Sequence, residues 1–141
     1  MDVHSKETRS YNMSRITAKD TKPEVKVRKY LFAQGFRYRK NDKRYPGHPD
    51  IVLPKYKTMI FVNGCFWHMH EGCSDFSLPQ SNTAFWENKL SYNRARDEKV
   101  QTELKRSGWN VIIIWTCEIK GHLFEERMSE VVSTIKHFIV T

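Results

Sequence analysis

The apolar residues of this 141-residue chain recur with two spacings, one typical of helices and one typical of strands. An apolar residue at every third or fourth position predicts a helix, whereas alternating or continuous apolar runs predict strands. We therefore expect helices over 21–34, 83–107 and 124–138, and strands over 36–40, 50–53, 58–63 and 109–116. The last strand is almost continuously apolar, as expected for a central buried strand. This order of elements predicts an α/β protein, a three-layer sandwich around a central mixed sheet.

Local sequence signals agree with the predicted ends of the first helix. Thr21 and Glu24 form a capping box, and Pro23 stands in the first turn, where a missing N–H is tolerated. Gly35 suits the left-handed residue that ends a helix. Three proline and glycine residues between 41 and 49 then predict a loop.

The chain length suits one hydrophobic core, so we expect one domain over 20–141, preceded by a polar, basic arm over 1–19. No apolar run approaches the ~20 residues of a membrane-spanning helix. The N-terminal segment also lacks the apolar stretch of a signal peptide. The odd cysteine count argues against a disulfide framework and predicts reduced thiols in a cytoplasmic protein.

Positive charge is concentrated toward the N-terminus. Residues 1–44 contain 13 Lys and Arg against 5 Asp and Glu, whereas residues 45–141 contain 11 of each. The net charge of +8 therefore belongs to the first third of the chain. A concentrated basic region attracts polyanions and favours a nucleic acid partner. A solvated arm without a partner has the same composition.

The segment that begins at Cys65 has the composition of a metal-binding loop. Cys65, His70 and Cys73 supply two thiolates and an imidazole, and Cys117 is the remaining cysteine. Zinc prefers four such donors in a tetrahedron, so these residues are the predicted Zn²⁺ ligands. Cys65 and Cys117 each follow a predicted strand, so this site requires the two strands to be neighbours. His68 is an alternative ligand to His70.

Asp50 begins one predicted strand, and Val62 and Asn63 end the next. A carboxylate and a backbone carbonyl brought together can hold Mg²⁺, which takes oxygen ligands and keeps several waters. Such a cation polarises a phosphodiester and stabilises its leaving oxygen. An aspartate after a proline is also common in turns, where it bonds its own backbone. This fragment alone leaves a purely structural Asp50 open.

His68 is the candidate proton acceptor, because a zinc-fixed loop would hold its imidazole rigidly and histidine titrates near neutrality. Asp97, midway along the long predicted helix, could orient this imidazole or hold a metal-bound water. The alternatives are a solvent-facing His68 and an Asp97 that forms a surface ion pair with Arg94, Arg96 or Lys99.

Large aromatic side chains surround the candidate histidine. Phe66 and Trp67 precede it directly, and Trp86 lies near the start of the long predicted helix. Such rings can act as a wedge between base pairs. They can equally pack into the core above the zinc loop. For Trp86 both interpretations stay open, because the neighbouring Phe85 can fill the core position instead.

Taken together, these residues resemble the very short patch repair endonucleases, which nick DNA beside T:G mismatches that arise by deamination of 5-methylcytosine. The resemblance covers nearly the whole chain, and its most specific part is the block Gly64-Cys65-Phe66-Trp67-His68. The other matching positions are Thr8-Arg9-Ser10, Asn12-Met13, Asp20-Thr21, Glu24, Pro46-Gly47, Pro49-Asp50, Phe85-Trp86, Lys89, Asn93, Arg96-Asp97, Gly108-Trp109, Trp115 and Cys117.

The resemblance implies a restriction-endonuclease-like fold and a strand-specific, Mg²⁺-dependent endonuclease that nicks 5′ of the mismatched T. It assigns Asp50 and the backbone carbonyl of Val62 to Mg²⁺ and His68 to water activation. Glu24 and Asp97 take supporting roles. The four Cys and His ligands named above would hold a structural Zn²⁺.

The resemblance also implies how DNA is engaged. Phe66, Trp67 and Trp86 would intercalate next to the mismatch, while Met13 and Ile16 of the arm press from the other groove. The implied partners are double-stranded DNA containing a mismatch, mismatch-repair proteins and a companion cytosine-5 methyltransferase. The implied state is a monomer without a membrane, working at the nucleoid of the bacterial cytoplasm.

Two positions depart from the family pattern. Asn63 stands where the best-known member carries histidine, so an imidazole role is lost there, although asparagine can still hydrogen-bond a metal-bound water. The residues Glu71-Gly72 lengthen the spacing between His70 and Cys73 by one residue. Two other functions compete with the leading hypothesis: a restriction or homing-type endonuclease on the same fold, and a non-catalytic, zinc-stabilised DNA-binding module.

Overall fold

The described part of the chain contains a mixed sheet with the strand order β1-β2-β3-β4. The first two neighbouring pairs are antiparallel, and β3 pairs with β4 in parallel. The strands are β1 (Arg39–Lys40), β2 (Ile51–Leu53), β3 (Thr58–Asn63) and β4 (Asn110–Trp115).

The computed structural model describes residues 21–70, 72–74 and 76–138. The predicted arm, with Met13 and Ile16, therefore lies outside the described residues. None of the helices in the described ranges is both long enough and apolar enough to cross a membrane.

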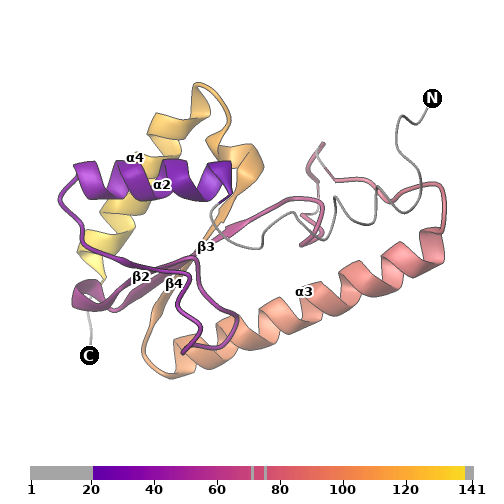
Figure 1. The fold of residues 1–141 in the computed structure, drawn as a ribbon, viewed down its shortest axis with the longest axis horizontal. Coiled ribbons are helices and arrows are strands. Elements are labelled where there is room, and N and C mark those ends of the chain that lie inside the picture. Colours follow the sequence, from indigo (N-terminus) through magenta and orange to yellow (C-terminus); the bar gives the residue numbers. More distant parts are fainter. Residues whose placement is uncertain (1–20, 71, 75, 139–141) are drawn as a thin grey trace.

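Helices cover both faces of the sheet and produce the predicted three layers (Figure 1). Two of them, α2 (Lys22–Ala33) and α4 (Leu123–His137), share one face, and α3 (Thr83–Arg106) lies against the other. Two short 3₁₀ turns, η1 (Pro54–Tyr56) and η2 (Thr116–Ile119), complete the elements of the described chain.

Alternating side chains of the strands supply two separate cores. Ile60 and Ile112 belong to the larger core, beneath α2 and α4, whereas Met59 and Val111 join the smaller core beneath α3. This alternation is the two-residue period of a strand covered on both faces. The predicted α/β sandwich is confirmed.

The ends of α2 follow their sequence signals. The Thr21 hydroxyl accepts a hydrogen bond from the backbone N–H of Glu24 at 3.4 Å, and Gly35 takes a left-handed φ of +94° just after the helix. Between these ends, Val27 and Leu31 are fully buried and anchor the helix to the sheet.

The register of β3 against β4 determines where the functional loops begin. Val62 pairs with Ile114 and Asn63 pairs with Trp115, so the two strands end together. The segments that start at Gly64 and Thr116 therefore leave the sheet side by side. This meets the requirement that the predicted metal site places on the two strands.

Three predicted details are wrong. In the described sheet β4 is an edge strand, not a central one, and its apolar residues are needed because helices cover both of its faces. β1 is shorter than predicted, because Phe36 turns into the core and is 2% exposed. The last helix ends at His137, so Phe138 is its cap and not part of its apolar stripe.

The loop that leads into β2 packs tightly at Gly47. A Cβ atom at this position would lie 2.6 Å from Val100 Cγ1 of α3 and 3.3 Å from Phe61 Cε1 of β3, and the φ angle is +77°. Only glycine satisfies both the backbone angle and the close approach. The loop is thereby fixed between α3 and β3, immediately before Asp50.

Replacing Gly47 by alanine should lower the free energy of unfolding by about 2–4 kcal/mol, because overpacking adds to backbone strain. Gly35→Ala is the matched control: its φ is also positive, but an added Cβ meets nothing within 4 Å. Urea unfolding of both variants measures the difference. Equal losses in the two variants would contradict the tight packing at position 47.

Candidate active site and metal-binding cluster

A cavity of about 420 Å³, here named the Asp50 cavity, lies where α2, β3, α3 and the loop before β2 meet. The residues given a catalytic or metal-binding role around Asp50 all line it: Glu24, Asp50, Val62, Asn63, His68 and Asp97. These residues come from segments far apart in the sequence, so the fold gathers them around one space.

The Asp50 side chain hydrogen-bonds to the backbone of β3 and not to the backbone of its own turn. Its carboxylate oxygen Oδ2 accepts a hydrogen bond from the backbone N–H of Val62 at 2.7 Å. Burial raises the pKa of Asp50 to about 7; the Val62 N–H opposes this rise, the adjacent Glu24 carboxyl adds to it, and His68 opposes it. Asp50 is therefore a desolvated acid whose charge requires a nearby cation.

Glu24 is the second carboxyl group of the cavity. It is 3% exposed, and Arg28, itself 5% exposed, forms an ion pair with it at 3.7 Å one helical turn later. Two buried carboxyl groups next to each other favour either a shared proton or a bound cation. This oxygen-rich site suits a hard divalent ion. The i,i+4 spacing of Glu24 and Arg28 is the sequence signal that could have found the arginine.

His68 and Asp97 are direct partners. The Nδ1 atom of His68 forms a hydrogen bond with Asp97 Oδ2. This leaves Nε2 as the ring nitrogen that can accept a proton from another group. Arg94 forms its own ion pair with Glu98 at 3.5 Å. The surface ion-pair alternative for Asp97 is therefore not what the structure shows.

A second cavity, of about 370 Å³, borders the same pair between α3 and β4. Gln101 and Asn63 line both cavities. Asn63 is 6% exposed. Sequence reasoning missed Gln101, although it lies one helical turn after Asp97 and so on the same face of α3.

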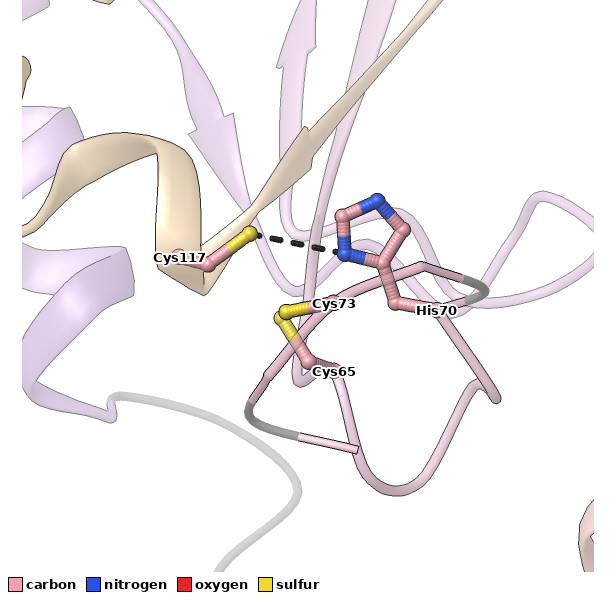
Figure 2. Close-up of side chains that lie close together, drawn as sticks. All are labelled: Cys65, His70, Cys73 and Cys117. Atoms are coloured by element: carbon pink, nitrogen blue, oxygen red, sulfur yellow. Dashed lines mark hydrogen bonds between the residues drawn. The ribbon is translucent and has the colours of Figure 1, made fainter. Parts of the chain in front are cut away.

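The predicted soft ligands form one compact cluster (Figure 2). One ligand atom from each of Cys65, His70, Cys73 and Cys117 lies within 4.8 Å of the others. The Sγ atom of Cys117 is 3.4 Å from Nδ1 of His70. Thiolate and imidazole ligands of one zinc ion lie roughly 3.5–3.8 Å apart, so the cluster has nearly the spacing that a single ion demands. His70, and not His68, is the histidine of the cluster.

The charges of the thiols also favour a cation. Burial raises the pKa of the Cys117 thiol to about 12, and the sulfurs of Cys73 and Cys65 add to the rise. Burial acts in the same direction on Cys65, but hydrogen bonds from the Thr116 hydroxyl, the Cys117 backbone N–H and His70 outweigh it and lower its pKa to about 7. A divalent ion would stabilise all three thiolates together.

Three aromatic rings pack on one another beside these groups. The ring centroids of Phe66 and Trp67 are 5.1 Å apart, those of Phe66 and Trp86 5.6 Å, and those of Trp67 and Trp86 5.9 Å. All three side chains are half-buried, and the Lys89 ammonium lies 5.8 Å from the Trp86 ring. The rings thus form a surface cluster, stabilised by edge-to-face contacts.

The interpretation that Phe85 fills a core position is wrong, because its side chain is 58% exposed. The N-terminal half of α3 extends beyond the sheet (Figure 1), so no core lies beneath this turn of the helix. Only Leu90 and Leu104 are buried along the whole of α3. Phe85 instead contacts Trp86 edge-to-face at 5.4 Å.

Desolvated carboxyl groups beside a histidine–aspartate pair, with a thiolate-rich cluster on the neighbouring loop of an α/β sandwich, are groups that suit a hydrolase. Residues 1–75 match the family model described as DNA mismatch endonuclease Vsr. The chain is 52% identical to the type II nicking enzyme V.NmeAIP of Neisseria meningitidis over 136 residues, 96% of each chain.

Two further relatives are a DNA mismatch endonuclease and a nicking enzyme. The DNA mismatch endonuclease Vsr of Escherichia coli is 40% identical over 131 residues, which cover 92% of this chain and 83% of that one. The type II nicking enzyme V.XorIIP of Xanthomonas oryzae is 44% identical over 118 residues, 84% of this chain and 86% of that one. The chain belongs to the Vsr family of DNA mismatch endonucleases, and it is a DNA endonuclease.

Asp50 should make the stability of the metal-free protein depend on pH. Its pKa is about 7 in the fold and about 3.9 in an unfolded chain. Because folding favours the protonated carboxyl, this contribution is complete below about pH 4 and is lost as the pH rises to about 7.

Urea unfolding in a chelator at about pH 5 and about pH 8 tests this expectation. Asp50→Asn should gain stability relative to the parent at the higher pH, because the neutral amide still accepts the Val62 hydrogen bond. A stability difference between parent and variant that is the same at both pH values would contradict the raised pKa.

Proposed function

We propose that this protein is a strand-specific, Mg²⁺-dependent DNA mismatch endonuclease that nicks 5′ of the T in T:G pairs and so initiates very short patch repair. The observation that carries the proposal is the Asp50 cavity, which joins Asp50 to the His68–Asp97 pair beside the surface aromatic cluster. Membership of the Vsr family supports the same activity.

Asp50 and the backbone carbonyl of Val62 hold the Mg²⁺ ion in this proposal. The desolvated Asp50 carboxyl beside Glu24 supports this, because burial raises the pKa of Asp50 and a divalent cation would stabilise its charged form. When bound, Mg²⁺ polarises the scissile phosphodiester and stabilises the charge on the leaving oxygen.

His68 takes a proton from the attacking water through Nε2, while Asp97 fixes the ring from the Nδ1 side. Asn63, a buried side chain that lines the same cavity, would hydrogen-bond a water at the metal end of the site. Glu24 supports the metal end of the site, and Arg28 keeps the Glu24 charge compensated.

The cluster of Cys65, His70, Cys73 and Cys117 holds a structural Zn²⁺. Four soft donors without a separate open position suit a structural site. Zinc binding contributes on the order of 10 kcal/mol in small zinc domains. Here that energy orders the loop that carries His68.

Phe66, Trp67 and Trp86 enter the base stack next to the mismatch. Their clustering and partial exposure support this role, since rings that serve only the core would be fully covered. Met13 and Ile16 of the arm press from the other groove. Selectivity for a mismatch then follows from the lower cost of unstacking a mispaired step.

The remaining parts of the proposal concern the cell. The protein acts as a monomer on double-stranded DNA at the nucleoid of the bacterial cytoplasm, since a mismatch has one faulty strand and needs one nick. A companion cytosine-5 methyltransferase generates the lesion-prone base, and mismatch-repair proteins act with the nuclease.

Strand-labelled duplexes with T:G, T:A or C:G at one position, incubated with Mg²⁺, test the activity. We expect one nick, 5′ of the T, and only in the T:G duplex. Asp50→Asn should slow nicking by more than about 100-fold, since metal activation contributes several kcal/mol, while DNA affinity largely persists.

Glu103→Gln is the matched control, because it makes the same carboxylate-to-amide change on an exposed part of α3. It should nick like the parent. Cleavage of both strands of a matched duplex would contradict the proposal and support the restriction-type alternative. A folded parent that binds DNA but does not nick it with Mg²⁺ would also contradict the proposal.

A further inference from the structure

The end of β4 and the start of η2 form a turn, here named the 115–118 corner, that supports the metal cluster from one side. The Trp115 indole lies flat on the His70 imidazole, with ring centroids 4.1 Å apart and planes 4° apart. The Thr116 hydroxyl is 3.5 Å from Cys65 Sγ. The next residue along the corner is itself a ligand. The corner thereby touches or supplies three of the four ligands.

Glu118 closes this corner through its side chain. Its Oε1 atom accepts a hydrogen bond from the backbone N–H of Trp115 at 2.7 Å. A carboxylate acceptor makes this bond short and stronger than a bond between neutral groups. The bond fixes the backbone at the point where the chain leaves β4, and so it fixes the plane of the Trp115 ring beneath the histidine.

Arg127, from α4, holds Glu118 in turn. Its Nε atom lies 3.4 Å from Glu118 Oε2, an ion pair without a hydrogen bond at Nε among the described residues, and its Nη2 atom donates to the backbone carbonyl of Ile113 at 3.0 Å. The side chains of Glu118 and Arg127 are 33% and 21% exposed, so the pair is largely shielded from solvent. Glu130 also lies 3.4 Å from the guanidinium, but it is 62% exposed. Arg127 thus joins the corner to β4 and α4.

We infer that Glu118, held by Arg127, is a positioning residue of the metal cluster, which sets the orientation of His70 and the place of Cys117. The inference rests on the proposed binding of a metal at this cluster. Loss of a group that orients a metal ligand without touching the ion typically lowers metal affinity by about 10- to 100-fold. The Glu118–Arg127 pair matches this description, because it acts only through the backbone and ring that the ligands contact.

An ordinary stabilising ion pair would behave differently. It would add to the free energy of unfolding but would leave the affinity and the spectrum of a bound metal unchanged. Metal binding therefore separates positioning from simple stabilisation. The protein's own sequence offers a matched comparison, since Glu118 and Glu130 both pair with Arg127 and only Glu118 bonds the corner.

The experiment uses the full chain, loaded with Zn²⁺ for affinity by competition with a chromophoric chelator and with Co²⁺ for its ligand-field spectrum. Glu118→Ala should weaken Zn²⁺ binding by about 10- to 100-fold and shift the thiolate–Co²⁺ bands. Glu118→Gln should weaken Zn²⁺ binding less than Glu118→Ala does, because the glutamine amide oxygen still accepts the hydrogen bond from the Trp115 N–H. Glu130→Ala should stay within about twofold of the parent.

Equal affinities in the parent and Glu118→Ala, or equal losses in Glu118→Ala and Glu130→Ala, would overturn the inference. If Glu118→Ala does not fold, the Zn²⁺ affinities of Glu118→Gln and Glu130→Gln are compared instead. A larger loss of affinity in Glu118→Gln supports the role of Glu118, and equal affinities overturn it. A parent that binds neither Zn²⁺ nor Co²⁺ would overturn the metal cluster itself, which is a distinguishable result.

Discussion

Where β3 and β4 run parallel, with Asn63 opposite Trp115, two segments far apart in the sequence leave the sheet at the same edge. One segment carries Cys65 and the other carries Cys117, so the soft-ligand cluster exists only in this register. On the other side of β3, the backbone N–H of Val62 holds the Asp50 carboxylate. A slip of one residue between β3 and β4 would turn every side chain of β4 to the opposite face and would break the soft-ligand cluster.

Burial disfavours negative charge in both the Asp50 cavity and the soft-ligand cluster. Burial, with a smaller contribution from Glu24, raises the pKa of Asp50 to about 7, and burial, with contributions from the sulfurs of Cys73 and Cys65, raises the pKa of Cys117 to about 12. Both groups cost folding energy in a chain without cations, and both are relieved by divalent ions of different character, one hard and one soft. Local instability of this kind is common where residues are retained for activity.

Residue type and spacing were sufficient to predict the three cysteine ligands, because the chain has no other cysteine, whereas the choice of His70 over His68 needed the structure. The same holds for the elements of the sandwich, whose periodicity is strong. Sequence alone could not show that β4 is an edge strand, since coverage by helices on both faces gives it the apolar pattern of a central strand. Nor could it show the exposure of Phe85 or the Glu118–Arg127 pair, because both depend on where α3 and α4 lie relative to the sheet.

The late position of Cys117 in the chain has a consequence for protein synthesis. A nascent chain that has not reached Asn110 lacks β4 and the fourth soft ligand, although from Trp86 onward it contains Asp50, His68 and every aromatic ring of the surface cluster. The loop around His68 therefore has no completed cluster to order it until translation has passed most of the coding sequence. Truncated products released by a stalled ribosome would carry the residues of a nuclease without their assembled geometry.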